Sequence, residues 1–559
     1  MSEQRRRPPA RRPLDGVSDP VGYRRRLGAG PAPRRRTASL PRNQRVREGA
    51  YVFTKHPARR RAPWVAGAAA AAALVLAVWL WTRPVTVEVT PLPADARVTL
   101  GDRSAVGTLT AGGMKPGAYA LRVERAGFAP VERTLKAKRL FGTSEEVSLE
   151  PLPQQLGVRC VTPKGASITM LVGDKKYSGA EALTQTVPAG PVRVSVAKDG
   201  FNTYSTDLFL DAERALIVNL DPKGQLVHTL GMIPCAGRPK GVMVTPDGRE
   251  AWTTILNAQP SIEIVDPRTG RITGGINLGT HGAVEVLFNK AGTRAYASQM
   301  ETAKVFEVDV KTRKVLREFK TGSPKNWTKV IELSPDEKTL YASNWSGDSV
   351  SIFDLKTGTL TDEIAVAKTP RGLYAADDGM TLWVASFDTG ILERVDLESG
   401  ARETVFKSTG GALRHFVADE KSRRLFTSDM GRDCVWVTDL DTGETKKFVD
   451  TDEKPNTIDL SPDAKVLFVS CRGENGSNYY VPGPEWGSIL LLDAATGKPL
   501  DAIIGGDQCT ALDVSDDGKT LVFSDFLDNR LRVYDVPGYA VLAKGGGGRY
   551  QAHLGEIRK

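Results

Sequence analysis

Basic side chains recur at one position of a repeated unit in the C-terminal half of the chain. If the repeats close around an axis, these side chains converge on one axial mouth, where positive charge in a cleft of low dielectric favours an anionic ligand. The alternative is a set of ordinary solvent-exposed Lys and Arg residues. Alignment of the repeats on their Asp-Gly turns places seven residues in register, namely Lys240, Val284, Lys329, Arg371, Arg414, Asn456 and Thr510. Five of these are the candidate ligand-binding residues: Lys240, Lys329, Arg371, Arg414 and Asn456.

The loops that follow the second strand of each repeat carry aromatic and polar residues. Such a mixture is typical of a face that recognises a protein or a glycan. The longest departure from the repeat is the insertion 473–486, of about ten extra residues, and insertions on a repeat scaffold often lie on the binding face. The candidate partner-binding residues are Trp345, Phe387, Arg432, Arg472, Tyr479, Tyr480, Trp486 and Phe526.

Recognised catalytic motifs are missing from the sequence. There is no Gly-x-Ser-x-Gly and no His-Glu-x-x-His, and Asp517–Thr520 lacks the glycine spacing of a phosphate loop. His281 and His415 fall near the starts of predicted inner strands, but no paired carboxylate or Cys stands at metal-ligand spacing. We therefore expect no cofactor, no metal and no catalytic residues, and we expect binding rather than catalysis.

The five cysteines lead to one structural hypothesis. No Cys-x-x-Cys is present, which argues against thioredoxin-like chemistry and against c-type haem attachment. Cys235 precedes the first inner strand and Cys509 precedes the last, and a closed ring makes those repeats neighbours. In an oxidising compartment we expect a disulfide between Cys235 and Cys509. The alternative is that both are small buried fillers.

The unit that positions all these residues repeats from Arg238 to Gly545. Each copy has a tight turn such as Asp377-Asp378-Gly379 and a second turn such as Asp354–Gly358, separated by strands with alternating apolar residues. The period of about 42–45 residues over about seven copies matches a four-stranded propeller blade. One such sheet cannot bury both faces, so we expect the copies to close into a ring rather than to form an open stack or a sandwich. Both Gln225–Ile233 and Tyr539–Lys544 fit the outermost strand of the last blade, and only one can hold that place.

Three strands carry a family resemblance. Leu340-Tyr-Ala-Ser-Asn344, Leu382–Ser386 and Val466–Ser470 resemble the repeats of the YVTN-repeat (YncE-like) seven-bladed propellers. The resemblance covers a little over half of the chain and implies the fold. It does not select a function, since this architecture hosts binding proteins, lactonases and redox enzymes.

Charge is distributed unevenly. The chain carries a net +10, but 18 Lys and Arg against 4 acids precede Pro63, so the remainder is slightly acidic. Residues 1–61 are rich in Arg and Pro and poor in apolar side chains, which predicts a disordered cytoplasmic tail. The basicity belongs to this tail, so nucleic acid is not an expected partner of the folded part.

An uncharged run, Ala62–Trp81, follows the tail. About 20 apolar residues suffice to cross a bilayer as a helix, and Trp64, Trp79 and Trp81 suit the two interfaces. We predict a signal-anchor helix at 62–82 in the inner (cytoplasmic) membrane, with the N-terminus cytoplasmic and the rest of the chain periplasmic. The alternatives are a cleaved signal peptide and a buried soluble helix.

Residues 84–152 and 153–222 form a duplicated pair, with alternating strands and Gly/Pro turns at a spacing of about 70 residues. We expect two small antiparallel sandwiches. They resemble the PEGA modules of bacterial envelope proteins. Pro163-Lys-Gly-Ala166 nearly matches the eponymous motif, whereas Pro93-Ala-Asp-Ala96 departs from it. Spacers and adhesive modules are both open interpretations.

The sequence therefore predicts an all-β fold: a seven-bladed propeller at 225–545 with a C-terminal tail at 546–559, two sandwich-like modules, one transmembrane helix and a disordered tail. The expected function is that of a non-enzymatic envelope protein whose propeller binds another envelope protein, a cell-wall polymer or a small anionic ligand. The alternative is a lactonase-like hydrolase acting on an acidic substrate, which would show an acid/base pair beside Lys329, Arg371 and Arg414.

Overall fold

The computed structural model describes residues 64–139 and 142–559. The predicted tail 1–61 lies outside the described residues. Helix α1 covers Trp64–Thr82, and the predicted span 62–82 begins two residues before it. Within the described part of the chain, no helix is long and apolar enough to cross a membrane. Nearly all the remaining elements are strands, which confirms the all-β class.

Two modules of equal design follow α1. Each has a four-stranded sheet, β3-β2-β5-β6 or β10-β9-β12-β13, and a three-stranded group, β4-β1-β7 or β11-β8-β14. The first comprises β1 (Val85–Leu92), β2 (Arg97–Leu100), β3 (Arg103–Val106), β4 (Leu109–Met114), β5 (Gly117–Glu124), β6 (Val131–Ala137) and β7 (Thr143–Ser148). The second comprises β8 (Pro153–Thr162), β9 (Ser167–Val172), β10 (Lys175–Ala180), β11 (Ala182–Pro188), β12 (Gly190–Ala197), β13 (Tyr204–Leu210) and β14 (Arg214–Asn219).

The expectation of purely antiparallel sandwiches is wrong in one respect. In each module the first strand pairs in parallel with the last, β1 with β7 and β8 with β14. The two sheets of a module share one apolar core, since alternate residues of each strand point inward, such as Val87, Val98 and Val123 in the first module.

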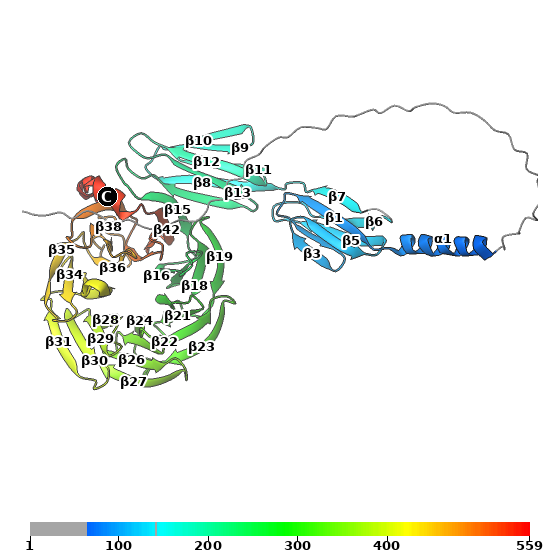
Figure 1. Cartoon of the computed structure of the whole chain (residues 1–559). Coiled ribbons are helices and arrows are strands. Elements are labelled where there is room, and N and C mark those ends of the chain that lie inside the picture. The colour runs from blue at the N-terminus through cyan, green and yellow to red at the C-terminus, as the bar shows by residue number, and fades with distance from the viewer. Residues whose placement is uncertain (1–63, 140–141) are drawn as a thin grey trace, which may run out of the picture. The chain divides into compact units, whose positions relative to one another are not determined.

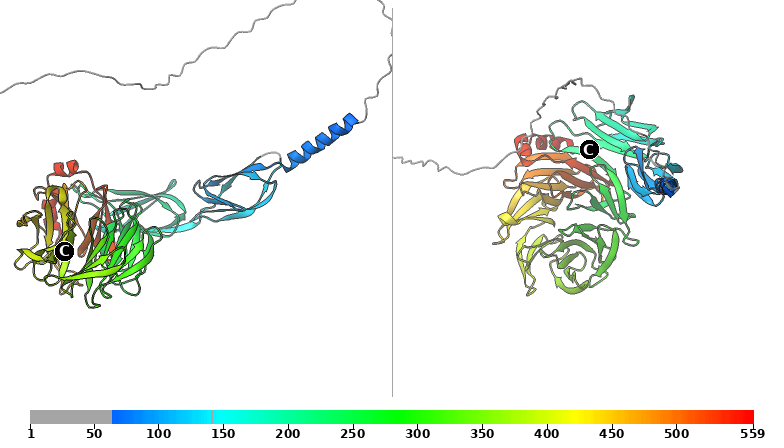
Figure 2. Two further views of the ribbon diagram at one scale, coloured as in Figure 1. Left: turned by 60° about the horizontal axis from the view of Figure 1, so that its bottom comes forward. Right: turned by 45° about the vertical axis from the view of Figure 1, so that its right-hand side comes forward.

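The predicted β-propeller is confirmed, with seven four-stranded groups around a common axis (Figures 1 and 2). Blades 1 to 3 are β16 (Pro239–Val244), β17 (Ala251–Ile255), β18 (Ile262–Asp266), β19 (Arg271–Ile276); β20 (Glu285–Phe288), β21 (Arg294–Gln299), β22 (Lys304–Asp309), β23 (Lys314–Lys320); and β24 (Thr328–Leu333), β25 (Thr339–Asn344), β26 (Ser349–Asp354), β27 (Thr359–Ala365). Blades 4 to 6 are β28 (Pro370–Ala375), β29 (Thr381–Ser386), β30 (Ile391–Asp396), β31 (Arg402–Lys407); β32 (Leu413–Asp419), β33 (Arg424–Asp429), β34 (Cys434–Asp439), β35 (Thr445–Asp450); and β36 (Pro455–Leu460), β37 (Val466–Cys471), β38 (Ser488–Asp493), β39 (Pro499–Ile504).

Blade 7 settles how the ring closes. It consists of β40 (Cys509–Val514), β41 (Thr520–Asp525) and β42 (Arg530–Asp535), and its outermost strand is β15 (His228–Pro234), from before blade 1. The competing segment is helical instead, as α2 (Tyr539–Gly545), followed by α3 (Gly548–Glu556), and both helices contact β39. A short 3₁₀ turn, η1 (Glu420–Ser422), lies in blade 5. The first strands of successive blades contact one another around the ring, including β40 with β16.

The closure explains why the predicted disulfide is wrong. Cys235 follows β15, the outermost strand of blade 7, while Cys509 begins β40, the innermost strand of the same blade. Three strand spacings of about 4.8 Å separate them, which exceeds the roughly 7 Å that a disulfide can bridge between Cα atoms. Both residues are free thiols.

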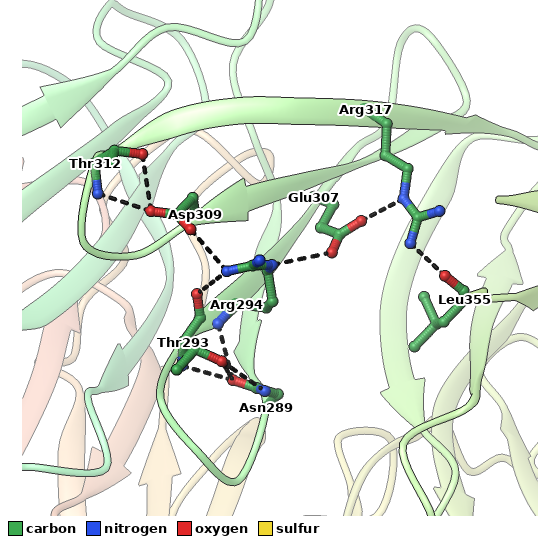
Figure 3. Close-up of polar contacts among 8 residues, drawn as sticks. All are labelled: Asn289, Thr293, Arg294, Glu307, Asp309, Thr312, Arg317 and Leu355. Carbon is green, nitrogen blue, oxygen red and sulfur yellow. Dashed lines mark hydrogen bonds and ion pairs between the residues drawn. The ribbon is translucent and has the colours of Figure 1, made fainter. Parts of the chain in front are cut away.

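An Asp side chain stabilises the second turn of the repeat by accepting hydrogen bonds, and Figure 3 shows this for blade 2. One carboxylate oxygen of Asp309 accepts hydrogen bonds from the backbone N–H and the hydroxyl of Thr312, at 2.9 and 2.8 Å. The other carboxylate oxygen pairs with Arg294 at 2.7 Å. The same Asp-to-Thr bonds recur at Asp354, Asp439 and Asp493. An Asp three residues before a Thr therefore fixes these four hairpin turns locally.

Neighbouring blades are also joined by polar contacts. Glu307 on β22 pairs with Arg294 and with Arg317 of the same blade (Figure 3). Arg317 in turn donates to the backbone oxygen of Leu355 in blade 3. Apolar clusters between adjacent blades supply the core. The result is a rigid ring that fixes the positions of its inner strands.

Candidate functional site: the axial mouth

The predicted mouth residues all lie at equivalent places on the innermost strands. Lys240, Lys329, Arg371, Arg414 and Asn456 are each the second residue of the first strand of a blade. In six of the seven blades the ladder between the first and second strands has a register shift at this point. A bulge bends the strand and redirects the side chains that it carries. The repeat therefore presents this residue at the axis.

Hydroxyl groups on the second strand hold these bulges in place. Ser343 accepts a bond from the backbone N–H of Val330, and its hydroxyl lies 3.4 Å from the backbone oxygen of Arg371 in the next blade. Ser428 donates to the backbone oxygen of Asn456 at 2.6 Å. Equivalent bonds to the next blade start from Thr254, Ser298 and Ser470. The recurring Ser or Thr of the repeat is the sequence signal for this role, and the sequence-based interpretation did not use it.

The arginine side chains at the mouth are buried, whereas Lys240 and Lys329 are half-buried. The exposed fraction is 3% for Arg371, 8% for Arg414 and 4% for Arg472. The Nε atoms of all three, and both amide atoms of the fully buried Asn456, lack a hydrogen-bond partner among the described residues. A buried donor without a partner costs about 1–3 kcal/mol. These atoms can therefore bond a group from outside the chain.

Burial and mutual repulsion of charge lower the pKa values of the basic side chains at the mouth. Burial, followed by the charges of Arg414, Arg371 and Arg472, lowers the pKa of Lys240 well below its ordinary value. Burial, followed by the charges of Arg371, Lys240 and Arg414, lowers the pKa of Lys329 to about 5. Burial and the charge of Arg371 also lower the pKa of Arg414. The prediction that positive charge converges here agrees with this geometry.

Tyr479 from the insertion 473–486 reaches into the cationic group. The Nζ of Lys240 donates to its hydroxyl at 2.6 Å, and the guanidinium of Arg472 lies 4.0 Å from its ring centroid. Tyr480 stacks edge-on against Tyr479 and is 50% exposed. Gln508 holds this loop by donating to the backbone oxygen of Tyr479 at 2.8 Å. The insertion thus covers part of the mouth, which its position outside the repeat register did not predict.

A second aromatic pair lies beside Lys329. Its Nζ is 3.3 Å from the ring centroid of Trp345, and Trp345 packs against Phe387 with 5.2 Å between ring centroids. Contacts of this kind between an amine and an aromatic face are worth about 0.5–2 kcal/mol. Two of the predicted partner-binding residues therefore belong to the wall of the mouth.

Four other predicted partner-binding residues have different places. Phe526 is fully buried beneath Tyr479 and cannot contact a partner, which corrects its prediction as a surface residue. Trp486 is half-buried under the Nζ of Lys559, at 4.4 Å from its ring centroid. Arg432 is exposed. Arg472, predicted to bind a partner from the loop after a second strand, instead joins the buried cations.

The end of the chain holds the insertion. The backbone N–H of Trp486 donates to the backbone oxygen of Ile557 at 2.8 Å, and that of Lys559 donates to Pro484 at 2.9 Å. The Nζ of Lys559 pairs with Asp507. Behind these contacts, His553 of α3 is fully buried and bonds Asp452 at 2.7 Å. The segment 546–559, predicted only as a tail, is thus an ordered support for the mouth.

Acidic groups line the axis below the mouth. A cavity of about 180 Å³ is bounded by Glu285, Glu332, Asp459, Asp513 and His415, among others. Burial raises the pKa of Glu332 to about 8 and that of Asp459 to about 7. Asp459 and Asp513 accept backbone N–H groups of the next blade, from Val514 and Val244 at 2.9 and 2.7 Å. These carboxyl groups join blades, and they make the floor of the axis acidic.

Glu285 and His415 stand one residue beyond the mouth position of their blades, and the sequence-based prediction of site residues omitted both. Burial raises the pKa of Glu285, which the charges of Arg371 and Arg414 lower in part. Burial lowers the pKa of His415 to about 3, so its imidazole is neutral. An acid and a neutral base therefore flank the mouth. Within the described ranges, no group of three His, Cys, Asp or Glu side chains could hold a metal ion.

A family match supports the propeller, and two known proteins share part of their length with this chain. Residues 282–408 match the family described as "Lactonase, 7-bladed beta-propeller". Antigen Lp49 of Leptospira interrogans serogroup Icterohaemorrhagiae serovar copenhageni (strain Fiocruz L1-130) is 34% identical over 269 residues, which are 46% of this chain and 58% of that protein. The chain thus spans less than two thirds of this relative. Kuenenia stuttgartiensis Hydrazine Synthase shares 17% identity at a TM-score of 0.46, over 53% of this chain and 95% of that one.

Proposed function

We propose that this chain is a binding protein of the cell envelope whose propeller holds an anionic ligand at the axial mouth. The observation that supports this most is the set of buried guanidinium groups of Arg371, Arg414 and Arg472, whose Nε atoms have no hydrogen-bond partner in the part of the chain that the structure describes. Water could satisfy a donor, but it would leave several like charges buried together. An anion satisfies both the donors and the charge.

Titration of the full chain with inorganic phosphate by calorimetry tests this proposal. We expect saturable binding of one phosphate per chain, weakened at least tenfold in Arg371→Met and in Arg414→Met. The matched control is Arg249→Met, because Arg249 is 75% exposed in its side chain and lies in a turn of blade 1. Absence of saturable binding, or equal weakening in the control, would contradict the proposal.

A partner at the rim of the mouth is the second part of the proposal. Tyr480 is half exposed, and the guanidinium of Arg238 lies 4.6 Å from its ring centroid. Exposed aromatic and Arg side chains are frequent anchors of interfaces. The partner class is an envelope protein or a cell-wall polymer. Affinity capture from membranes should lose its specific partner when residues 474–485 are deleted or when Tyr480 is changed to Ala, and should keep it in Arg249→Met.

Envelope anchoring is also part of the proposal, together with the YVTN-like and PEGA-like character of the β domains. It is supported by the uncharged sequence of α1 and by the basic residues that precede it. Proteolysis of intact spheroplasts should remove the propeller and spare the Arg-rich tail. Cleavage of the tail alone would contradict this topology.

A hydrolase acting on an acidic lactone is the second candidate, and the specific observation that favours it is the placing of Glu285 and His415 beside the cations. A general base must lie within reach of the attacking water, and a carboxylate with a raised pKa suits that role. Turnover of carboxylated lactones that disappears in Glu285→Gln would support this function. A panel of such lactones left unhydrolysed would exclude it.

A further inference from the structure

The balance of charge at the mouth bears on which anions it accepts. Three guanidinium cations, those of Arg371, Arg414 and Arg472, face the amines of Lys240 and Lys329, whose pKa values burial and these charges lower. The carboxylates facing them are Glu285, toward Lys240, Arg371 and Arg414, and Asp388, toward Lys329. The imidazole of His415 is neutral, because burial and the charges of Arg414 and Arg371 lower its pKa to about 3, and it adds no negative charge. A bound anion raises the pKa values of the two amines, so each further negative charge on the ligand is met by a further protonated group.

The unpaired donors come from several directions. Arg371 lies on β28, Arg414 on β32 and Asn456 on β36, and Arg472 follows β37, so three adjacent blades contribute. Lys240 on β16 and Lys329 on β24 complete the ring from other sides of the axis, and Figure 1 shows the strands β16, β24, β28 and β36 around it. A single carboxylate presents two oxygens in one plane. It cannot meet donors that surround it.

The floor of the axis sets the depth at which an anion can bind. Glu332, Asp459 and Asp513 lie further along the inner strands than the cations. They bear no positive charge and repel an anion whenever they are ionised, so the positive charge that attracts an anion lies at the level of the guanidinium groups. An anion is therefore confined to the level of the cations, which demands a compact ligand rather than a long chain along the axis.

We infer that the mouth selects a compact multivalent oxyanion, with acidic oxygens pointing in several directions, over a monovalent carboxylate. This inference rests on the anion site proposed above and adds the valency of its ligand. Such an anion can accept two parallel hydrogen bonds from a guanidinium group, and it neutralises several buried charges at once. It displaces the Tyr479 hydroxyl from Lys240, since that hydroxyl is the polar group now bound there.

The test is a series of carboxylates that differ in charge and carry no hydroxyl groups: butyrate, glutarate and tricarballylate. Each is titrated into the full chain at fixed ionic strength, with inorganic phosphate as a separate probe. We expect the dissociation constant to fall at least tenfold with each added carboxylate, at one ligand per chain. In Arg371→Met and Arg414→Met the dissociation constants of the three carboxylates should differ much less from one another. The exposed control Arg249→Met should keep the differences of the wild type.

The outcomes separate the two proposals. Equal affinity for all three carboxylates, with phosphate still bound, would overturn the valency inference and leave the anion site standing. Failure of every probe to bind would overturn both. If the dissociation constant still falls tenfold with each added carboxylate in Arg371→Met and Arg414→Met, the selection for charge occurs at another site, and the inference is also overturned. Lys240→Met serves as the replacement variant if an Arg variant does not fold.

Discussion

At the scale of single residues, the mouth holds charges that the folded chain alone does not compensate. Replacing a buried, unpaired charge by an apolar side chain of similar length removes its desolvation cost. The side chains of Arg371 and Arg414 are therefore expected to oppose stability and to serve binding. The effect of a substitution on stability therefore distinguishes a functional Arg from a structural one, because a structural Arg would stabilise the fold.

We predict that Arg414→Met raises the free energy of unfolding of the ligand-free chain by about 1–4 kcal/mol. The same variant should lose the rise in melting temperature that phosphate gives the wild type. Arg249→Met should change stability by less than about 0.5 kcal/mol. Thermal unfolding with and without phosphate measures both effects. A lower melting temperature for Arg414→Met would show that the guanidinium stabilises the fold.

We predict that sulfate binds more tightly as the pH falls. The pKa of Lys329 is about 5 because of burial and the charges of Arg371, Lys240 and Arg414. A bound anion favours the protonated amine and raises this pKa, so binding takes up a proton above pH 5. The affinity should rise from pH 9 toward pH 5 and then level off. Sulfate keeps its charge over this range, and Lys329→Met should reduce the slope. An affinity independent of pH in the wild type would contradict this.

At the scale of elements, much of the site could be predicted because one repeated β unit fixes the register of its members. The repeat register alone is enough to make Lys240, Lys329 and Arg371 equivalent positions around one axis. It could not place Tyr479, because an insertion has no register with the repeat. It also misplaced Cys235, because two segments fitted the closing strand and hydrophobic pattern alone did not distinguish a strand from helix α2.

We predict that Glu332→Gln reduces the pH dependence of stability. Glu332 on β24 accepts the backbone N–H of Ala375 on β28, and burial raises its pKa to about 8 from 4.5. A folded-state pKa above the unfolded one means that this group's contribution is complete below pH 4.5 and is lost as the pH rises toward 8. Gln keeps an acceptor and does not titrate. Denaturant unfolding between pH 5 and pH 8.5 should show a smaller loss in the variant, and equal losses would refute this.

At the scale of the whole molecule, the ring is closed by a strand from before the first blade. β15 supplies the fourth strand of blade 7 and also pairs with β14 of the second module. The propeller and the second module therefore share a hydrogen-bonded connection. The repeat pattern in the sequence predicts a β-propeller but does not choose between Gln225–Ile233 and Tyr539–Lys544 for its closure.

A matched pair of substitutions tests the closure. Ile233 on β15 is 1% exposed, and Val541 on α2 is 51% exposed. Ile233→Asp should lower the free energy of unfolding by at least about 3 kcal/mol, because it buries an unpaired charge. Val541→Asp should change it by less than about 0.5 kcal/mol. Equal destabilisation by the two changes would show that α2 contributes to closure as much as β15.

The central claim is that the buried cations at the mouth hold a multivalent anion. Crystals of the full chain grown with selenate test this directly, because selenium scatters anomalously and its position is unambiguous. We expect one anomalous peak on the axis, within hydrogen-bond distance of Arg371 and Arg414, with the hydroxyl of Tyr479 withdrawn from Lys240. Peaks confined to the outer surface, with Tyr479 still bound to Lys240, would contradict it.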